Sequence, residues 1–160
     1  MLKLFLLRHG KATKFIDDKS DFTRHLNRQG VVQTNQVGYI VREKKASIDQ
    51  LICSGAVRTL ETAEIMNHYL AIRRIESDDD LYLAKHDQIL RKICESGSGK
   101  NLLYVGHNNG ISDLASYLSG KAVNLSTGHL VEIHFNLDDW NLITKASGHF
   151  VSEIIPDIHS

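Results

Sequence analysis

The sequence predicts an α/β protein whose central sheet is mostly parallel and ends in an antiparallel hairpin. Short apolar runs, typical of buried strands, alternate with longer segments of helical periodicity. Three of these runs end abruptly in small or polar residues, as strands do in open α/β sheets, where ligands bind beyond the carboxyl ends. Near the C-terminus the apolar period becomes two, which indicates an antiparallel strand.

The first apolar run carries the residues around which the rest of the chain is organised. Leu4 to Leu7 end at Arg8 and His9, so a cation and an imidazole lie at the end of a buried strand. Gly10 follows and has no Cβ, and we expect it to let the backbone turn and an anion approach closely. This stretch alone is equally consistent with a strand that ends in an ordinary charged turn.

The second apolar run repeats this pattern. Lys11 to Arg24 is polar and has no period, which predicts a loop over the end of the first strand. Asn27 is the expected N-cap of a helix that reaches about Lys45. Leu51 to Cys53 forms the next buried strand, and an amphipathic helix runs from Arg58 to Leu70. Arg58 opposes the dipole of this helix from its first turn, so a bound anion would explain its position.

The remaining elements continue the alternation. We expect a short strand at Ile72 to Ile75, an acidic loop at Glu76 to Asp80, a helix at Asp87 to Glu95, a turn at Gly97 to Lys100, a strand at Leu102 to Val105, and a helix at Ile111 to Leu118. His107 and Asn108 follow the last of these strands. In the tail, Leu130 to Phe135 has period two, and Trp140 to Ala146 is predicted to pair with it.

Composition favours a single domain, residues 1–160. The chain has 160 residues and is 42% hydrophobic, which suffices for a core. Its 19 Lys and Arg balance its 19 Asp and Glu, so no global field attracts nucleic acid or an anionic membrane. Cys53 and Cys94 lack metal-type spacing and are expected to be reduced core thiols. The N-terminal apolar run is too short for a signal peptide or a membrane span, so we expect a cytoplasmic protein.

A parallel sheet would bring the strand ends to one edge and form a pocket of two arginines and two histidines: Arg8, His9, Arg58 and His107. With no carboxylate nearby, such a pocket favours a dianion, and planar guanidinium groups match phosphate oxygens. At an ordinary pKa of about 6.5, His9 would offer an unprotonated nitrogen that attacks phosphorus and forms a covalent phosphoimidazole. His107, protonated in the field of a bound phosphate, would donate to an equatorial oxygen of that phosphate.

A zinc site is the main chemical alternative, since imidazoles often bind zinc. The two arginines would repel a divalent cation, and no carboxylate or cysteine joins the histidines at a suitable spacing. The sequence therefore predicts neither a metal nor another cofactor. The other histidines are scattered, and we expect ordinary surface or hydrogen-bonded roles for them.

Three segments, each after an apolar run, resemble the signature of the histidine phosphatase superfamily: Leu7 to Gly10, Ser54 to Ala63, and Val105 to Asn108. The short length and the segment Ser20 to Gly30 resemble most closely the SixA-like phosphohistidine phosphatases. The resemblance extends from Leu2 to about Leu118. It implies a three-layer α/β/α sandwich of the phosphoglycerate mutase-like kind.

The resemblance also implies roles for the site residues. His9 would be the phosphorylated nucleophile, and the phosphate pocket would be completed by Arg8, Arg58 and His107. Asn108, next to His107, is expected to bind substrate. The roles of Arg8, His9, Arg58 and His107 agree with those inferred above from the chemistry of their side chains.

The general acid is the open role. Larger family members use a glutamate from an insertion that this chain lacks, so Asp21, in the loop over the pocket, is the first candidate. Glu76 and Asp80 follow. A site without a dedicated acid favours phosphohistidine, because the departing imidazole has a conjugate acid with a pKa of only about 6.5, whereas an alkoxide needs a proton.

The resulting expectation is a phosphatase that hydrolyses phosphohistidine on a signalling or phosphotransfer protein through a His9 phosphoenzyme. One alternative is a phosphomonoesterase of the same superfamily that acts on small phosphorylated molecules. Another is a non-catalytic adaptor that binds phosphate, although an adaptor has no use for a nucleophile aimed at phosphorus. A mutase is disfavoured because little chain remains to close over a bisphosphate.

Overall fold

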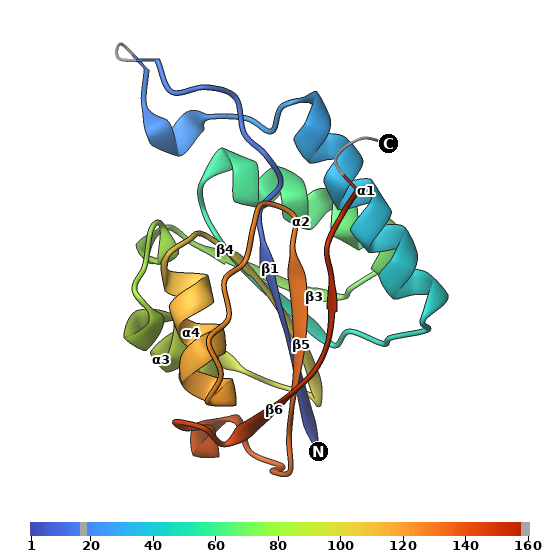
Figure 1. Ribbon diagram of the computed structural model, residues 1–160, viewed down its shortest axis with the longest axis vertical. Helices are drawn as coiled ribbons and strands as arrows, with labels where there is room; N and C mark the ends of the chain where they lie inside the picture. Colours follow the sequence, from blue (N-terminus) through green and yellow to red (C-terminus); the bar gives the residue numbers. More distant parts are fainter. Residues whose placement is uncertain (17–18, 158–160) are drawn as a thin grey trace.

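The computed structural model describes residues 1–16 and 19–157. Asp17 and Asp18 of the predicted loop, and residues 158–160, lie outside the described residues. The centre of the fold is a six-stranded sheet in the order β3-β2-β4-β1-β5-β6 (Figure 1). Its strands are β1 (Leu2–Arg8), β2 (Gln50–Ser54), β3 (Arg74–Asp78), β4 (Asn101–Gly106), β5 (Leu130–Phe135) and β6 (Gly148–Ile154).

Four neighbouring strands of the sheet are parallel. β1 pairs with β4, β4 with β2, and β2 with β3, all in parallel. β5 runs antiparallel to both β1 and β6. The predicted fold class, a mostly parallel sheet with an antiparallel C-terminal hairpin, is confirmed. The carboxyl ends of β1, β2 and β4 consequently lie at one edge of the sheet.

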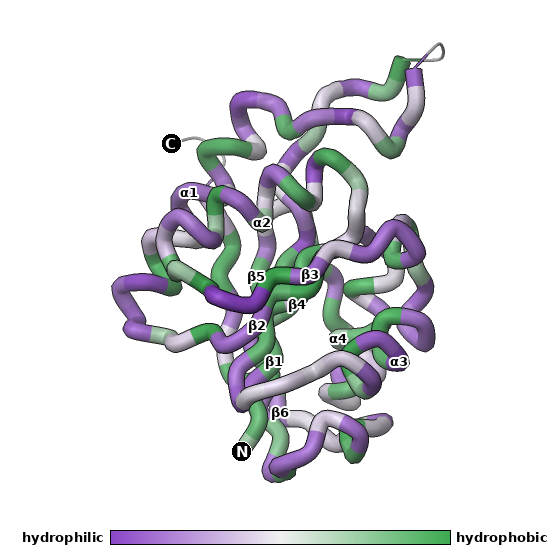
Figure 2. Tube along the Cα trace, turned by 180° about the vertical axis from the view of Figure 1, so that it is seen from behind, coloured by the Kyte–Doolittle hydropathy of each residue, from purple (hydrophilic) through white to green (hydrophobic). Residues whose placement is uncertain are grey.

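Two helices cover each face of the sheet (Figure 1). α1 (Arg28–Glu43) and α2 (Val57–Leu70) pack on one face, and α3 (His86–Ser96) and α4 (Gly110–Ser119) pack on the other. Residues alternate along β1, so Leu4 and Leu6 face α3 and α4, whereas Phe5 and Leu7 face α1 and α2. Figure 2 shows hydrophobic residues concentrated along the central strands. The expected three-layer sandwich is therefore present.

The predicted helices and buried strands lie close to their expected positions. The side chain of Asn27 accepts a hydrogen bond from the Gly30 N–H at 2.9 Å, as an N-cap does. Arg58 lies in the first turn of α2, as predicted. Cys53 is a buried free thiol, whereas Cys94 is only half-buried. Within residues 1–16 and 19–157, no helix combines the length and apolar character that crossing a membrane requires.

Two predicted strand positions are wrong. The segment Trp140 to Ala146 is not a strand: it begins with a short 3₁₀ helix, Trp140–Leu142, and the second hairpin strand is β6. Trp140 is buried and its indole N–H donates to the carbonyl of Gly99 at 2.9 Å, so a tertiary contact overrides the local pattern. Glu76 belongs to β3 rather than to a loop, and this strand begins at Arg74. β3 is a largely exposed edge strand, so it lacks an apolar run.

The glycine after β1 serves helix packing. A Cβ on Gly10 would lie 2.6 Å from the carbonyl oxygen of Gly30, in the first turn of α1. The start of α1, rather than an anion, therefore occupies the space that this glycine leaves. The close approach fixes the end of β1, and with it His9, against α1.

Candidate active site

Four predicted site residues lie at the carboxyl edge of the sheet. We call this set the His9 cluster: Arg8, His9, Arg58 and His107. Nε of Arg58 lies 3.3 Å from Nε2 of His9, and Nη2 of Arg58 lies 3.4 Å from Nδ1 of His107. The two imidazole rings are 5.3 Å apart. The ends of β1 and β4 and the first turn of α2 thus bring together residues that are distant in the sequence.

His9 is held in one tautomer. Its Nδ1 lies 2.7 Å from the carbonyl oxygen of Gly10, which can only accept, so Nδ1 carries the proton and donates. Nε2 keeps a lone pair that faces Arg58. His9 is 7% exposed, and burial, together with the charge of Arg58, outweighs the Gly10 hydrogen bond and lowers its pKa to about 4. The imidazole is therefore neutral at pH 7, as a nucleophile requires.

His107 is neutral as well. Arg58 Nη2 donates to its Nδ1, so its Nε2 carries the proton and donates to Oγ of Ser54 at 2.8 Å. Burial, followed by the neighbouring His9 and the charge of Arg58, lowers the pKa of His107 to about 3. The predicted protonated form therefore needs a bound anion, whose charge would raise this pKa. Nδ1 would then donate to a phosphate oxygen.

Arg8 supplies a donor without a partner. Its Nη1 donates to the carbonyl of Leu125 at 3.0 Å, but its Nε is buried and has no hydrogen-bond partner among the described residues. A buried unpaired donor costs about 1–3 kcal/mol. Burial and the charge of Arg58 also lower the pKa of Arg8. An anion bound between the two arginines would relieve both effects.

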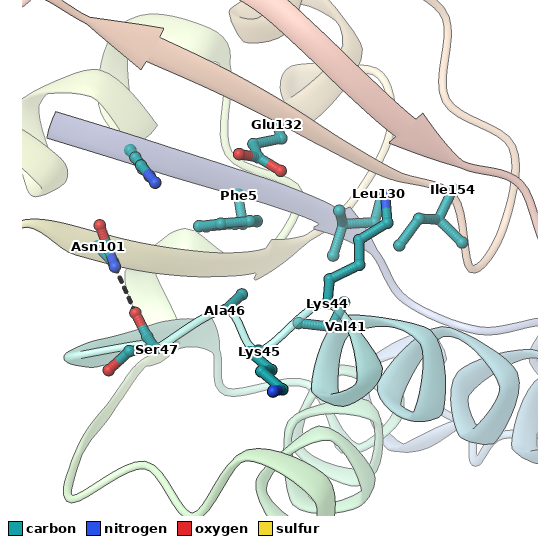
Figure 3. A pocket seen from close by; sticks show the side chains of 11 residues that line it. Phe5, Val41, Lys44, Lys45, Ala46, Ser47, Asn101, Leu130, Glu132 and Ile154 are labelled. Atoms are coloured by element: carbon teal, nitrogen blue, oxygen red, sulfur yellow. Dashed lines mark hydrogen bonds between the residues drawn. The ribbon is translucent and has the colours of Figure 1, made fainter.

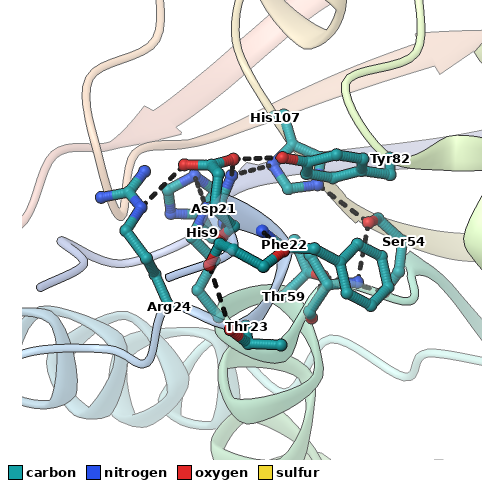
Figure 4. Close-up of polar contacts among 12 residues, drawn as sticks. His9, Asp21, Phe22, Thr23, Arg24, Ser54, Thr59, Tyr82 and His107 are labelled. Carbon is teal, nitrogen blue, oxygen red and sulfur yellow. Dashed lines mark hydrogen bonds and ion pairs between the residues drawn. The ribbon is translucent and has the colours of Figure 1, made fainter. Parts of the chain in front are cut away.

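A carboxylate lies beside the His9 cluster, in the loop where the family resemblance puts Asp21, although the four residues alone predict none. Asp21 begins a short 3₁₀ helix, η1 (Asp21–Thr23), in the segment between β1 and α1. Its Oδ2 accepts from Nη2 of Arg58 at 3.1 Å and from the hydroxyl of Tyr82, and its Oδ1 accepts from Nε of Arg24 at 2.8 Å (Figure 4). The carbonyl of Asp21 also accepts from Nη1 of Arg58 at 2.7 Å. Asp21 thus partly neutralises the pocket.

These contacts keep Asp21 ionised. Burial raises the pKa of its carboxyl group, but the Tyr82 hydrogen bond and the charges of Arg58 and Arg24 outweigh burial and lower the pKa to about 2. In this arrangement Asp21 has no proton to donate at neutral pH. Its role as general acid stays a prediction, and that role requires proton uptake when substrate binds.

The other two acid candidates are engaged elsewhere or exposed. Glu76 forms an ion pair with Lys92 at 2.6 Å. Asp80 is exposed, and its backbone N–H donates to the side chain of Asp78 at 2.9 Å. Among the described residues, the hydrogen bonds and ion pairs link neither carboxylate to the His9 cluster.

Asn108 is linked to the His9 cluster only through other residues in the hydrogen bonds of the described part of the chain. Its side-chain oxygen accepts from the hydroxyl of Ser112, and that hydroxyl accepts from the backbone N–H of Leu125 at 2.9 Å. Leu125 in turn holds the guanidinium of Arg8. Asn108 therefore supports Arg8 indirectly, and its direct contact with substrate stays a prediction.

Three further residues of the site were missed by sequence reasoning. Ser54 and Arg24 lie in segments that carry the family resemblance, so a signal was present, but their contacts depend on the fold. Tyr82 follows the acidic stretch and has no local signal. Its ring lies edge-on to His107, 5.4 Å between centroids, and edge-on to Phe22, 5.0 Å between centroids. Tyr82 and η1 therefore cover the His9 cluster together.

A separate cavity of about 400 Å³ lies beside the N-terminal half of β1 (Figure 3). Its lining combines apolar side chains of the sheet and α1 with three lysines: Lys3, Lys44 and Lys45. The cavity shares no lining residue with the His9 cluster, so it is separate from the candidate active site. Within the described part of the chain, no three His, Cys, Asp or Glu side chains are grouped to hold a metal ion.

The buried neutral histidines predict a loss of stability in acid. Below pH 6.5 the unfolded chain protonates His107, whereas the folded protein does so only near pH 3, so the free energy of unfolding falls as the pH drops through this range. Each such histidine contributes about 1.4 kcal/mol per pH unit. In urea unfolding between pH 6 and 4.5, the slope of the free energy of unfolding against pH should be smaller in His107→Asn by about 1.4 kcal/mol per pH unit. The exposed control His149→Asn should have the same slope as the unmodified protein. If His107→Asn also had this slope, His107 would not be the buried neutral histidine that causes the loss of stability.

Comparison with known proteins shows a family to which the chain is similar. The sequence pattern of the histidine phosphatase superfamily (branch 1) matches residues 4–82. The uncharacterized protein ML1117 of Mycobacterium leprae is 27% identical over 133 residues, covering 81% of each chain. A provisionally named phosphohistidine phosphatase SixA from Agrobacterium tumefaciens has a TM-score of 0.85 at 19% identity, covering 97% of this chain and 98% of that chain. The protein histidine phosphatase SixA complexed with tungstate has a TM-score of 0.79 at 18% identity, covering 96% of both chains. The sequence pattern of residues 4–82 is therefore that of the histidine phosphatase superfamily, and the whole chain has the fold of these SixA structures.

Proposed function

We propose that this protein is a phosphatase that hydrolyses phosphohistidine on a signalling or phosphotransfer protein through a phosphorylated His9. One observation carries the proposal: Nε2 of His9 is unprotonated and faces Arg58, while the buried Nε of Arg8 lacks a partner among the described residues. Such a site is suited to bind a tetrahedral dianion and to attack its central atom.

The proposed reaction has two displacement steps. In the first, Nε2 of His9 attacks phosphorus, the P–N bond of the substrate breaks, and its electron pair stays on the departing ring nitrogen. The ring leaves as neutral imidazole because its other nitrogen carries a proton. In the second step, water attacks the phosphorus, the bond to Nε2 breaks, and inorganic phosphate leaves while one proton of the water passes to solvent. Arg8 and Arg58 would hold the non-transferred oxygens throughout.

The state of Asp21 supports a phosphoramidate substrate over an ester. An ester oxygen needs a proton as it departs, but the carboxylate nearest to the pocket is ionised. An imidazole whose second nitrogen is protonated leaves without further help. The names of the two SixA structures, and the tetrahedral oxyanion tungstate bound by one of them, support the same substrate class.

Substrate selectivity tests the proposal. We expect kcat/KM for a phosphohistidine peptide to exceed that for a phosphotyrosine peptide or a sugar phosphate by about 100-fold or more, because a positioned acid is worth 10²–10⁴-fold for these two leaving groups. A preference for the sugar phosphate would reject the proposal in favour of a small-molecule phosphomonoesterase. Tight binding of the phosphohistidine peptide without turnover would reject it in favour of an adaptor.

A further inference from the structure

We infer that Asp21 is a specificity-determining residue: the incoming phosphoryl group takes its place on Arg58, and the displaced carboxylate then accepts a hydrogen bond from the second ring nitrogen of phosphohistidine. This inference rests on the proposed function and deepens it. It gives Asp21 the role of an acceptor and so replaces the general-acid role that the sequence suggests.

Asp21 occupies a place on Arg58 that a phosphate oxygen would need. Arg58 is 2% exposed, and its Nη2 donates to Oδ2 of Asp21 at 3.1 Å while lying 3.4 Å from His107. A phosphoryl group with its phosphorus at Nε2 of His9 requires this same donor. A carboxylate and a dianion on one guanidinium nitrogen repel each other, so binding of the phosphoryl group displaces Asp21.

The displaced carboxylate stays close to the leaving group. Nε of Arg24 donates to Oδ1 of Asp21 at 2.8 Å, and Nη1 of Arg24 donates to the carbonyl of Thr13 at 2.6 Å. The backbone at Thr13 therefore holds Arg24, and Arg24 holds the carboxylate of Asp21. Figure 4 shows Asp21 lying between Arg24 and Tyr82. In-line attack by His9 puts the leaving group on the far side of phosphorus, towards η1 and Tyr82, which cover the cluster.

A departing imidazole offers Asp21 a donor that an ester lacks. The second ring nitrogen of phosphohistidine carries a proton in the reactive form, and a nearby carboxylate raises the pKa of that nitrogen. Asp21 would thereby increase the fraction of substrate with a good leaving group, with no proton transfer to or from the carboxylate. The oxygen of an ester has no N–H and is repelled by the same carboxylate.

Titration with inorganic phosphate at pH 8 tests the displacement without any turnover. Asp21→Asn keeps the shape of the side chain and removes its charge, so the Kd measured by calorimetry should fall about tenfold or more, since like charges at a binding site are strongly unfavourable. Tyr82→Phe removes only the hydroxyl that holds Asp21, and a smaller fall is expected. Asp87→Asn, an exposed change on α3, should leave the Kd unchanged. Unchanged or weaker phosphate binding in Asp21→Asn would overturn the displacement.

Activity with two substrates tests the acceptor role. In Asp21→Asn, the ratio of kcat/KM for a phosphohistidine peptide to kcat/KM for phenyl phosphate should fall about tenfold or more. Both substrates gain from the freed Arg58, but only phosphohistidine loses a charge-assisted hydrogen bond. The alkaline limb of the phosphohistidine pH profile should also move to lower pH. A general acid would give the reverse: loss for phenyl phosphate and retention for phosphohistidine, which would overturn the inference.

The two measurements separate this inference from the proposed function. If the unmodified protein fails to hydrolyse the phosphohistidine peptide, the proposed function is rejected and the acceptor role is rejected with it. The phosphate titration still decides whether Asp21 competes for Arg58. If the protein is active and Asp21→Asn keeps the ratio of kcat/KM between the phosphohistidine peptide and phenyl phosphate, only the acceptor role is overturned.

Discussion

Replacing His9 by alanine is expected to lower kcat on a phosphohistidine peptide by about 10⁴-fold or more, a loss typical of removing a nucleophile. Without Nε2 no covalent phosphoenzyme can form, and the remaining cluster can only bind the phosphoryl group. Steady-state kinetics on the purified variant measures the effect. Calorimetry should show that inorganic phosphate still binds, because Arg8, Arg58 and His107 are retained.

His149→Ala provides the matched control, since this histidine is exposed on β6. It should keep the full kcat, and circular dichroism should show the same fold for both variants. Substantial turnover by folded His9→Ala would contradict the nucleophile assignment.

Arg58→Ala is expected to reduce kcat/KM by about 10³-fold, a loss of the size seen when a donor to a transition-state oxyanion is removed. The guanidinium of Arg58 is buried and contacts three side chains that the reaction would need in fixed positions: His9, His107 and Asp21. The loss should appear in both kcat and KM, because Arg58 would contact the phosphoryl group in the ground state and in the transition state.

The pH profile distinguishes this effect from a general loss of structure. The charge of Arg58 helps burial to hold the pKa of His9 at about 4, so its removal should raise that pKa towards the ordinary value. The acid limb of kcat/KM, which reports the free enzyme, should therefore move to higher pH. Arg73→Ala, an exposed change, should leave the profile as it is. An Arg58→Ala variant with unchanged activity would contradict the proposed phosphate pocket.

The sequence predicts most of the sheet because the buried strands are marked by local composition. Leu4 to Leu7, Leu51 to Cys53 and Leu102 to Val105 are apolar on both faces, and in the structure both faces of these strands are covered. Since parallel strands end at one edge, the meeting of His9, Arg58 and His107 follows from that pattern.

Features that depend on tertiary contacts could not be predicted from the sequence. The family resemblance puts Asp21 in the loop over the pocket, but its ion pair with Arg58, 37 positions along the chain, depends on the fold. Tyr82 hydrogen-bonds to Asp21 across 61 positions, with no motif to indicate the contact. Trp140 is drawn into a 3₁₀ helix by burial and by its bond to Gly99, although its neighbours suggest a strand. In each case long-range packing, rather than local propensity, decides the outcome.

Trapping the covalent intermediate tests the central claim most directly. The protein would be mixed with a phosphohistidine peptide carrying labelled phosphate, quenched in alkali, and digested so that the labelled segment is identified by mass spectrometry. We expect acid-labile label on the segment that contains His9, and no label in His9→Asn. Label on any other residue, or turnover with no covalent label at times shorter than one catalytic cycle, would contradict it.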